Sequence, residues 1–374
     1  MATNNNNKAL NVPHLRFPEF TEEWETKPIN DLAVVIGGGT PDTTVKSYWD
    51  GEIQWFTPSE IGKTKYVDSS LRTITEDGLN NSSAKRLPPN TILLSSRATI
   101  GECSLSLREC ATNQGFQCLV SKKCNVDFLY YLIQTKKKDL IRKSCGSTFL
   151  EISANEVRKI QVSVPSDVEQ QKIAELLSLI DERIATQNKI IERYESLIRG
   201  IAQNVIRSNK PNVLLSECLE CSSSTLQESD VCENGTYPVY GANGIVGYLD
   251  DYNTEDEAVH IIKDGSGVGT VSYATGRCSA TGTLNTLQAK DGYLLQYLYY
   301  MLKVFNFEPY KTGMAIPHIY FKDYGKAKIF CPSYTEQLKY VELLSAIDNK
   351  LSAEQSILTN LSLQKQYLLR QMFI

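Results

Sequence analysis

Two segments of the chain carry apolar residues at alternating steps of three and four positions. In the first segment these are Ile173, Leu177, Ile180, Ile184, Ile191, Tyr194, Ile198, Ile201 and Val205. In the second they are Leu344, Ile347, Leu351, Leu358, Leu361, Leu368 and Met372. This period of about 3.5 residues is typical of a coiled-coil seam. We therefore predict two long helices, over residues 166–208 and 333–374.

A few polar residues interrupt the two apolar seams. A polar residue in a coiled-coil seam can fix the register in which the two helices pair. Gln187 and Glu354 interrupt them at equivalent positions, and Lys365 stands where the first segment has Ile198. Two such helices in one chain pair most simply with each other, in antiparallel orientation. The alternative is a parallel coiled coil with a second copy of the chain.

A second apolar row flanks the seams and consists of Leu176, Ile190, Leu197, Leu343 and Ile357. A two-stranded coil needs only one apolar stripe. The additional row therefore packs either on the rest of this chain or on a partner, and the sequence leaves both alternatives open.

The two helical segments belong to an internal repeat. Residues 165–184 and 332–351 are identical at 11 of 20 positions at a constant offset of 167. A Tyr-rich helical run at 128–133 matches 297–302 at an offset of 169. Short β-type runs between Gly and Pro residues precede each long helix, at 90–94, 117–120, 159–164, 258–262 and 326–330. The pattern predicts one α+β domain used twice, each copy followed by a long helix.

The length of 374 residues and the hydrophobic content of 41% fit two or three folded domains. No apolar run approaches the ~18 residues of a membrane span. The first residues are polar and Asn-rich and lack the apolar core of a signal peptide. We expect a cytoplasmic protein with a disordered N-terminus over 1–13. The ten cysteines are then expected as reduced thiols.

The net charge of −4 excludes a generally basic nucleic-acid coat but permits a basic face. Residues 211–259 hold ten acidic residues and no Lys or Arg, whereas 260–332 hold eight basic and four acidic residues. Any nucleic-acid contact in the second half is therefore expected within 260–332.

The usual catalytic and cofactor motifs are missing from the sequence. There is no phosphate-binding Gly-x-x-x-x-Gly-Lys-Ser/Thr loop, and the run from Gly265 to Gly269 lacks dinucleotide-binding spacing. Cys218, Cys221 and Cys232 lack the fourth ligand of a zinc site, so we interpret them as thiols. We expect no catalytic residues, no metal and no cofactor.

The sequence resembles the specificity subunits of type I restriction-modification systems over nearly its whole length. The resemblance rests on Val-Pro-Ser-x-x-Glu-Gln-Gln-Lys-Ile-Ala-Glu-Leu-Leu-Ser-x-Ile-Asp at 164–181 and on its second copy, Cys-Pro-Ser-x-x-Glu-Gln-x-Lys at 331–339. The opening Val-Pro-His-Leu-Arg-Phe-Pro-Glu-Phe at 12–20, followed by Trp24, is also similar. The copies differ where Leu338 replaces Gln171 and Tyr340 replaces Ile173.

This resemblance implies two target-recognition domains, at 14–165 and 209–332, separated by two long antiparallel coiled-coil helices. Each domain would read one half of a split, asymmetric double-stranded DNA site. The helices would fix the distance between the half-sites and dock methyltransferase subunits, two in number, with restriction subunits joining through the complex. The chain itself would catalyse nothing. The copies' differences leave open whether both helices dock partners equally.

Candidate DNA contacts are chosen by residue type, because Arg and Lys bind phosphate or guanine and Asn or Gln can pair with adenine. In the first half they are Lys63, Lys65, Arg86, Arg97, Asn113, Gln114 and Lys136 with its neighbours Lys137 and Lys138. In the second half they are Lys263, Ser266, Arg277, Thr281, Asn285, Lys311 and His318. For each one the alternative is a solvated surface group. For the whole chain the alternative is a coiled-coil scaffold whose globular ends bind proteins.

Overall fold

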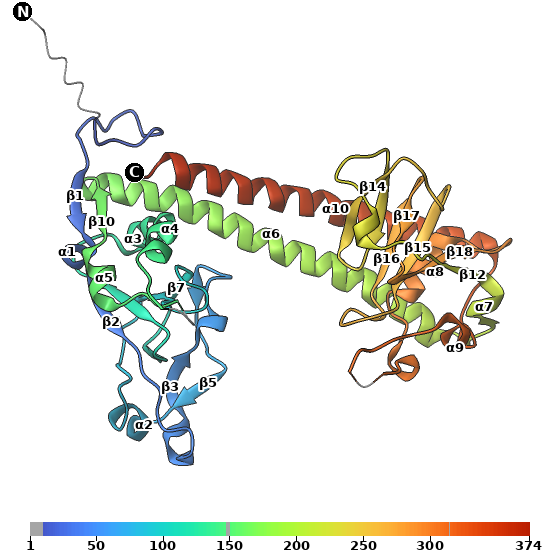
Figure 1. Ribbon diagram of the computed structural model, residues 1–374, viewed down its shortest axis with the longest axis horizontal. Coiled ribbons are helices and arrows are strands. Elements are labelled where there is room, and N and C mark those ends of the chain that lie inside the picture. Colours follow the sequence, from blue (N-terminus) through green and yellow to red (C-terminus); the bar gives the residue numbers. More distant parts are fainter. Residues whose placement is uncertain (1–9, 147–149, 314) are drawn as a thin grey trace, which may run out of the picture. The chain divides into compact units, whose positions relative to one another are not determined.

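A computed structural model describes residues 10–146, 150–313 and 315–374 of the chain (Figure 1). They form two compact units. The first unit comprises the described residues within 1–188 and 357–374, and the second comprises those within 189–356. Within the described ranges, no helix is long and apolar enough to cross a membrane.

The first unit is built on three small sheets. A five-stranded sheet has the order β2 (Ala33–Gly37), β9 (Gln117–Ser121), β6 (Ile92–Leu94), β7 (Cys103–Ser106) and β4 (Tyr66–Val67). A three-stranded sheet has the order β5 (Arg72–Ile74), β3 (Trp49–Phe56) and β8 (Cys110–Thr112). The strands β1 (Glu25–Pro28) and β10 (Gln161–Val164) form an antiparallel pair. The short helices are α1 (Ile29–Leu32), α2 (Glu76–Asn80), α3 (Val126–Thr135), α4 (Lys137–Arg142) and α5 (Ala154–Lys159).

The second unit repeats this plan with fewer strands. Its larger sheet has the order β12 (Leu219–Ser223), β18 (Leu284–Ala289), β15 (Glu257–Ile262) and β16 (Val271–Thr275). A smaller sheet has the order β14 (Gly244–Leu249), β13 (Tyr237–Gly241) and β17 (Ser279–Ala280). The strands β11 (Val213–Leu214) and β19 (Lys328–Ile329) pair with each other. The short helices are α7 (Leu215–Cys218), α8 (Leu295–Leu302) and α9 (Phe321–Tyr324).

The two units share one topology. The strand order β2-β9-β6-β7 of the first corresponds to β12-β18-β15-β16 of the second. The parallel pair β3 and β8 likewise corresponds to β13 and β17. The prediction of an α+β domain used twice is confirmed, and the predicted Tyr-rich helices are α3 and α8.

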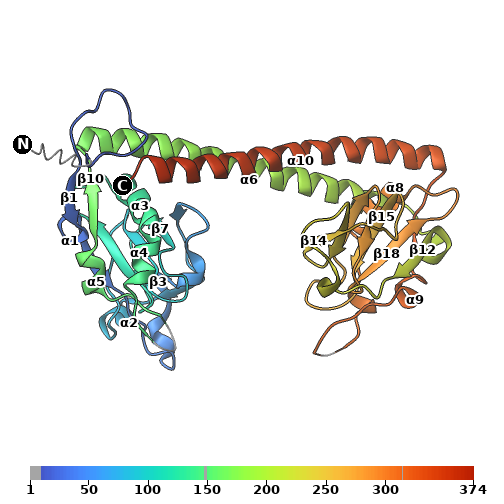
Figure 2. The same ribbon diagram turned by 45° about the horizontal axis from the view of Figure 1, so that its top comes forward.

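Two long helices, α6 (Asp167–Ser208) and α10 (Tyr334–Gln371), carry the predicted heptad seams. In the first unit, the last turns of α10 lie beside the first turns of α6 (Figures 1 and 2). In the second unit, Ile198 of α6 and Leu351 of α10 line one cavity. Early residues of one helix thus meet late residues of the other in both units. The pairing is therefore antiparallel and within one chain, as the simpler interpretation predicted.

The predicted seam residues are buried or half-buried throughout. The buried ones are Ile173, Leu177, Ile180, Ile191, Ile198, Leu344, Leu351, Leu361 and Leu368. The half-buried ones are Ile184, Tyr194, Ile201, Ile347 and Leu358. Burial of this apolar stripe is what holds each helix in place, because isolated helices gain little from propensity alone.

The core of the first unit contains the end of α10. Phe373 stacks on Phe128 of α3 with ring centroids 5.3 Å apart, and it meets the edge of Trp24 at 6.3 Å. Leu368 and Met372 belong to the same core. Residues from both ends of the sequence thus complete one hydrophobic core.

We expected disorder over residues 1–13. Residues 1–9 of this segment lie outside the described residues, and residues 10–13 are described. The described part differs from that expectation. The backbone N–H of Trp24 donates to the carbonyl of Asn11 at 2.9 Å, and the Ser163 hydroxyl donates to the Asn11 side chain at 3.2 Å. Pro13 is buried. The folded region therefore begins a few residues earlier than residue 14.

Candidate nucleic-acid interface

Three loops of the first unit meet at one place. They are the hairpin loop 95–102 between β6 and β7, the loop 113–116 between β8 and β9, and the described residues of 145–152 before α5. The N–H of Ser96 donates to the carbonyl of Gly115 at 2.8 Å. The N–H of Ile152 donates to the carbonyl of Ser96 at 3.1 Å. Ser96 therefore ties the three loops together through its backbone.

The second unit joins three loops by the same hydrogen bonds. The N–H of Lys263 donates to the carbonyl of Thr283 at 3.0 Å, and the N–H of Ile319 donates to the carbonyl of Lys263 at 2.9 Å. Lys263 thus occupies the place of Ser96. We name these two sets, 95–102 with 113–116 and 145–152, and 262–270 with 281–283 and 311–319, the convergent loops of each unit; the name covers only their described residues.

A glycine closes the hairpin loop in each unit. Gly101 has φ +88° and Gly269 has φ +90°, a region that L side chains rarely adopt. A Cβ atom on Gly101 would lie 2.8 Å from Cγ of Lys137, and one on Gly269 would lie 3.1 Å from Cβ of Phe307. The loop can therefore turn and pack against the segment after the Tyr-rich helix only with glycine at this position.

The structure brings about half of the predicted DNA contacts to the convergent loops. In the first unit these are Arg97, Asn113 and Gln114, and in the second they are Lys263, Ser266, Lys311 and His318. Gln114 and Ser266 are exposed, and the others are at least partly accessible. Charged and amide side chains on adjoining loops form a surface that can meet both phosphates and base edges.

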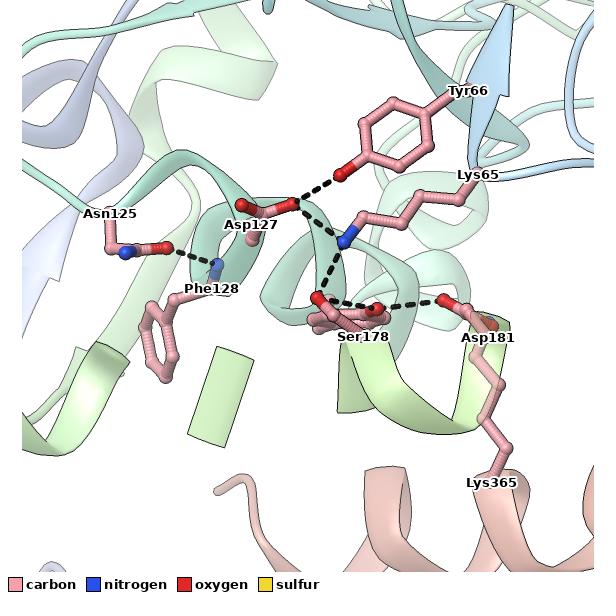
Figure 3. Close-up of polar contacts among 9 residues, drawn as sticks. Lys65, Tyr66, Asn125, Asp127, Phe128, Ser178, Asp181 and Lys365 are labelled. Carbon is pink, nitrogen blue, oxygen red and sulfur yellow. Dashed lines mark hydrogen bonds and ion pairs between the residues drawn. The ribbon is translucent and has the colours of Figure 1, made fainter. Parts of the chain in front are cut away.

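Three predicted contacts are buried, which is a correction to the sequence-based choice. Lys65 lies with Nζ 2.6 Å from Oδ1 of Asp127 and 2.7 Å from Oγ of Ser178 (Figure 3). Thr281 is 1% exposed, and its hydroxyl pairs with that of Thr283 at 2.8 Å. Asn285 is 4% exposed and donates to the Tyr324 hydroxyl at 3.0 Å. Their hydrogen-bonding groups serve the interior of the fold, so DNA cannot reach them.

The remaining predicted contacts lie outside the convergent loops. Arg86 pairs with Glu76 and with Glu109, and Arg277 lies over the ring of Tyr252. Lys136 donates to the carbonyl of Ile374 at 2.5 Å, and burial lowers the pKa of its ammonium group. Lys63 is exposed beside the long helices of the first unit. Of the neighbours of Lys136, Lys137 pairs with Glu102 at 2.5 Å and Lys138 is exposed.

A buried glutamine of the repeated signature fastens each unit to its long helix, a role that sequence reasoning missed. Gln170 accepts from the N–H of Asn125 at 3.0 Å and donates to the carbonyl of Pro165 at 3.0 Å. Gln337 accepts from the N–H of Leu294 at 2.8 Å and donates to the carbonyl of Pro332 at 3.0 Å. The only sequence signal was the recurrence of Glu-Gln in both copies of the repeat.

A tyrosine makes a second matched attachment. The Tyr131 hydroxyl donates at 2.7 Å to Oδ2 of Asp181, which is labelled in Figure 3. The Tyr300 hydroxyl donates to Oδ2 of Asp348 at 3.3 Å. Burial raises the pKa of both phenols above the ordinary value, so both remain hydroxyl donors. The Tyr-rich helix of each unit is thus held at its first residue and again further along the helix.

The long helices also expose apolar side chains. Leu197, Leu343 and Ile357 of the predicted flanking row are 47%, 50% and 43% exposed. Further exposed apolar residues on these helices are Val168, Leu179, Tyr334, Leu338, Leu363 and Tyr367. Leu176 and Ile190 are half-buried. Of the two alternatives for the row, packing on the rest of this chain therefore does not describe these three residues.

All ten cysteines are free thiols, and the part of the chain that the structure describes holds no group of three or more His, Cys, Asp or Glu residues that could bind a metal ion. Burial raises the pKa of Cys218 to about 12 and that of Cys221 to about 11. A thiol that keeps its proton is a poor metal ligand.

This chain is similar to several known proteins. A specificity subunit of the type I restriction enzyme MjaIX from Methanocaldococcus jannaschii is 39% identical over 183 residues, which are 47% of this chain and 42% of that relative. The type I restriction enzyme EcoprrI specificity subunit from Escherichia coli is 23% identical over 87% of this chain and 88% of its own length. The solved S subunit from M. genitalium has the same fold, with a TM-score of 0.63, 19% identity and coverage of 97% and 99% of the two chains.

The family model of the type I restriction modification DNA specificity domain matches this chain twice, at residues 21–196 and 215–362. Each match contains one set of convergent loops and one signature glutamine. The chain therefore belongs to the family of type I restriction-modification DNA specificity subunits, which supply target recognition and are not themselves catalytic.

Proposed function

We propose that this chain selects the DNA target of a type I restriction-modification complex. Each set of convergent loops reads one half of a split double-stranded site. The proposal rests on one observation: the convergent loops of the two units share the same backbone hydrogen bonds but carry different side chains. The backbone hydrogen bonds of Ser96 and Lys263 coincide, while the side chains around them differ.

Different side chains on a common frame favour different half-sites. Asn113 in the first unit has Thr281 at the matching place, because both N–H groups donate to the end of an equivalent strand. A partly accessible amide can bond both N6 and N7 of adenine in the major groove, whereas a buried threonine cannot. The target is accordingly asymmetric, with the reading domains at 14–165 and 209–332.

The paired long helices are proposed to set the distance between the half-sites. The helix α6 has 42 residues and α10 has 38 residues. At 1.5 Å per residue, helices of this length measure about 60 Å. Successive turns of the major groove recur about every 34–36 Å, so such helices are long enough to separate two reading domains by a turn or more.

Methyltransferase subunits, two in number, are proposed to dock on the exposed apolar side chains of the long helices. Leu197, Leu343 and Ile357 support this, because they present apolar surface that this chain leaves exposed. Restriction subunits would join through that complex, which is expected in the cytoplasm. If these helices faced only water at Leu197, Leu343 and Ile357, polar residues would be expected at those positions.

A mobility-shift assay tests the proposal against the alternative of a protein-binding scaffold. The chain and its methyltransferase partner are incubated with a diverse DNA pool at several salt concentrations. We expect sequence-selective binding that weakens as salt rises, because phosphate contacts release counterions. Absence of binding across the pool with the partner present would contradict the proposal. Sequencing of methylated sites in the host genome then identifies the target.

Exchange of residues 14–165 for those of a relative assigns the halves of the site. One half-site should change and the other should persist. A change in both half-sites would show that the domains do not read independently.

A further inference from the structure

A pair of one acidic and one basic side chain bridges the convergent loops at the same place in both units. In the first unit, Nη2 of Arg97 lies 2.9 Å from Oε2 of Glu151. In the second, Nδ1 of His318 lies 2.6 Å from Oδ1 of Asp264. The repeat offset of 167 relates Arg97 to Asp264 and Glu151 to His318. The acid and the base have therefore exchanged places between the units.

The backbone around the two pairs coincides as well. Arg97 and Glu151 form an isolated antiparallel bridge, and so do Asp264 and His318. Glu151 is bridged in turn to Cys145, and His318 is bridged to Thr312. Each pair thus joins the hairpin loop to the loop at 145–152 in the first unit or 311–319 in the second. Only the polarity of the pair differs.

The exchanged polarity distinguishes two roles for these residues. If the cation were selected for phosphate, both units would benefit from a base on the same loop. Instead the base lies on the hairpin loop in one unit and on the opposite loop in the other. The feature common to both units is a contact between an acidic and a basic side chain that joins the same two loops.

We propose that Arg97–Glu151 and Asp264–His318 are positioning pairs that hold the two loops of each unit at the separation DNA requires. This rests on the proposed function. All four side chains are 34–42% exposed. Pairs of this exposure contribute at most about 1 kcal/mol, so loss of one pair should weaken DNA binding about two- to fivefold.

The decisive variant is Glu151→Gln, measured in the complex with the methyltransferase partner on the cognate DNA. A positioning pair predicts weaker binding, similar to that of Arg97→Gln. A direct phosphate contact by Arg97 predicts the opposite, because loss of Glu151 frees the guanidinium and removes a negative charge. Equal or tighter binding by Glu151→Gln would overturn the proposal.

The exchange variant R97E/E151R is the second test, since it places the acidic and basic residues on the same loops as in the second unit. Binding should return to within about twofold of the unmodified complex if the link alone matters. Failure to recover, with each single variant still folded, would also overturn the proposal. The matched control is Asp68→Asn, which breaks the exposed Arg108–Asp68 pair (2.6 Å) and should leave DNA binding unchanged.

Half-site competition separates this proposal from the function on which it rests. Glu151→Gln should reduce discrimination at one half-site, and Asp264→Asn should reduce it at the other. If the unmodified complex shows no sequence selectivity, the proposed function fails. If it is selective but neither variant affects its own half-site, the function stands and the positioning pairs are rejected.

Discussion

Asp181 and Lys365 form an ion pair between the two long helices of the first unit, with Oδ1 2.6 Å from Nζ and with side chains 13% and 18% exposed. The other carboxylate oxygen accepts from the Tyr131 hydroxyl at 2.7 Å. One carboxylate thus joins α6, α10 and the Tyr-rich helix α3. At the seam position of Lys365, the first copy of the repeat has Ile198.

Lys365→Met should destabilise the first unit by about 1–3 kcal/mol, because it leaves the shielded carboxylate of Asp181 without its cation. The double variant with Asp181→Asn should lose less than the sum of the single losses. Urea unfolding followed by tryptophan fluorescence reports this unit, since its residues include all three tryptophans, Trp24, Trp49 and Trp55. Additive losses would show that the two groups do not interact.

Gln170→Leu should destabilise the first unit by about 2 kcal/mol or more, because it leaves the N–H of Asn125 and the carbonyl of Pro165 without their partner. The same fluorescence-detected unfolding measures it. Gln171→Ala is the matched control, because Gln171 is exposed and should be neutral within about 0.5 kcal/mol. Equal effects of the two substitutions would contradict the attachment role of Gln170.

His260 should make the second unit sensitive to acid. The ring is 1% exposed, neither nitrogen has a hydrogen-bond partner, and desolvation lowers its pKa to about 4. In the unfolded chain the ordinary value of about 6.5 applies, so the unfolded state binds the proton more readily. Stability is therefore full above about pH 6.5 and falls by about 3 kcal/mol as the pH drops to about 4.

Hydrogen exchange of the β15 amides as a function of pH measures this loss. His260→Leu should flatten the dependence between those two pH values. A steep dependence that survives the substitution would assign the acid sensitivity to other groups.

Gly200→Ala should stabilise the protein by about 0.5–1 kcal/mol. Gly200 lies inside α6 and is exposed, and an added Cβ would meet no atom within 4 Å. Alanine restrains the unfolded chain and favours the helix. Thermal unfolding should show the gain. Gly101→Ala is the contrasting variant, since its φ of +88° and its contact with Lys137 make the same substitution destabilising. A loss of stability from Gly200→Ala would contradict this prediction.

Deletion of one heptad from each long helix, residues 184–190 and 351–357, should shorten the gap in the DNA target. Seven helical residues span about 10 Å, or roughly three base pairs at 3.4 Å each. The half-site sequences should persist while the gap shortens or binding is lost. Sequencing of DNA retained from a random pool gives the answer. Retention of the same target with its original gap would refute the spacer role of the helices.

The periodic features of this fold could be predicted from the sequence. The steps of three and four from Ile173 onward, together with the offset of 167, were enough for both long helices and for the doubled domain. They succeed because a seam buried along its length must repeat in phase with the helix. The antiparallel pairing could be predicted as well, because two apolar seams of similar length in one chain can bury each other.

The candidate site was predictable only in part. Lys65 and Asn285 were chosen by residue type, yet each is satisfied inside the fold by Asp127 or Tyr324. Residue type says what a side chain can bind, and only the tertiary contacts say whether that capacity is already used. The ion pair between Arg97 and Glu151 could not be predicted for a related reason, since 54 residues separate them in the sequence and no local pattern joins them.

The packing of Phe373 against Trp24 and Phe128 fixes an order of events during synthesis. The core of the first unit lacks three of its members until residues 368–373 have left the ribosome, about 200 residues after Pro165. At 5–20 residues per second this interval is on the order of ten to forty seconds. The apolar residues at the start of α6, Ile173 and Leu177 among them, lack these α10 neighbours for nearly all of that time. The earliest-made part of this protein is therefore among the last to reach its final packing.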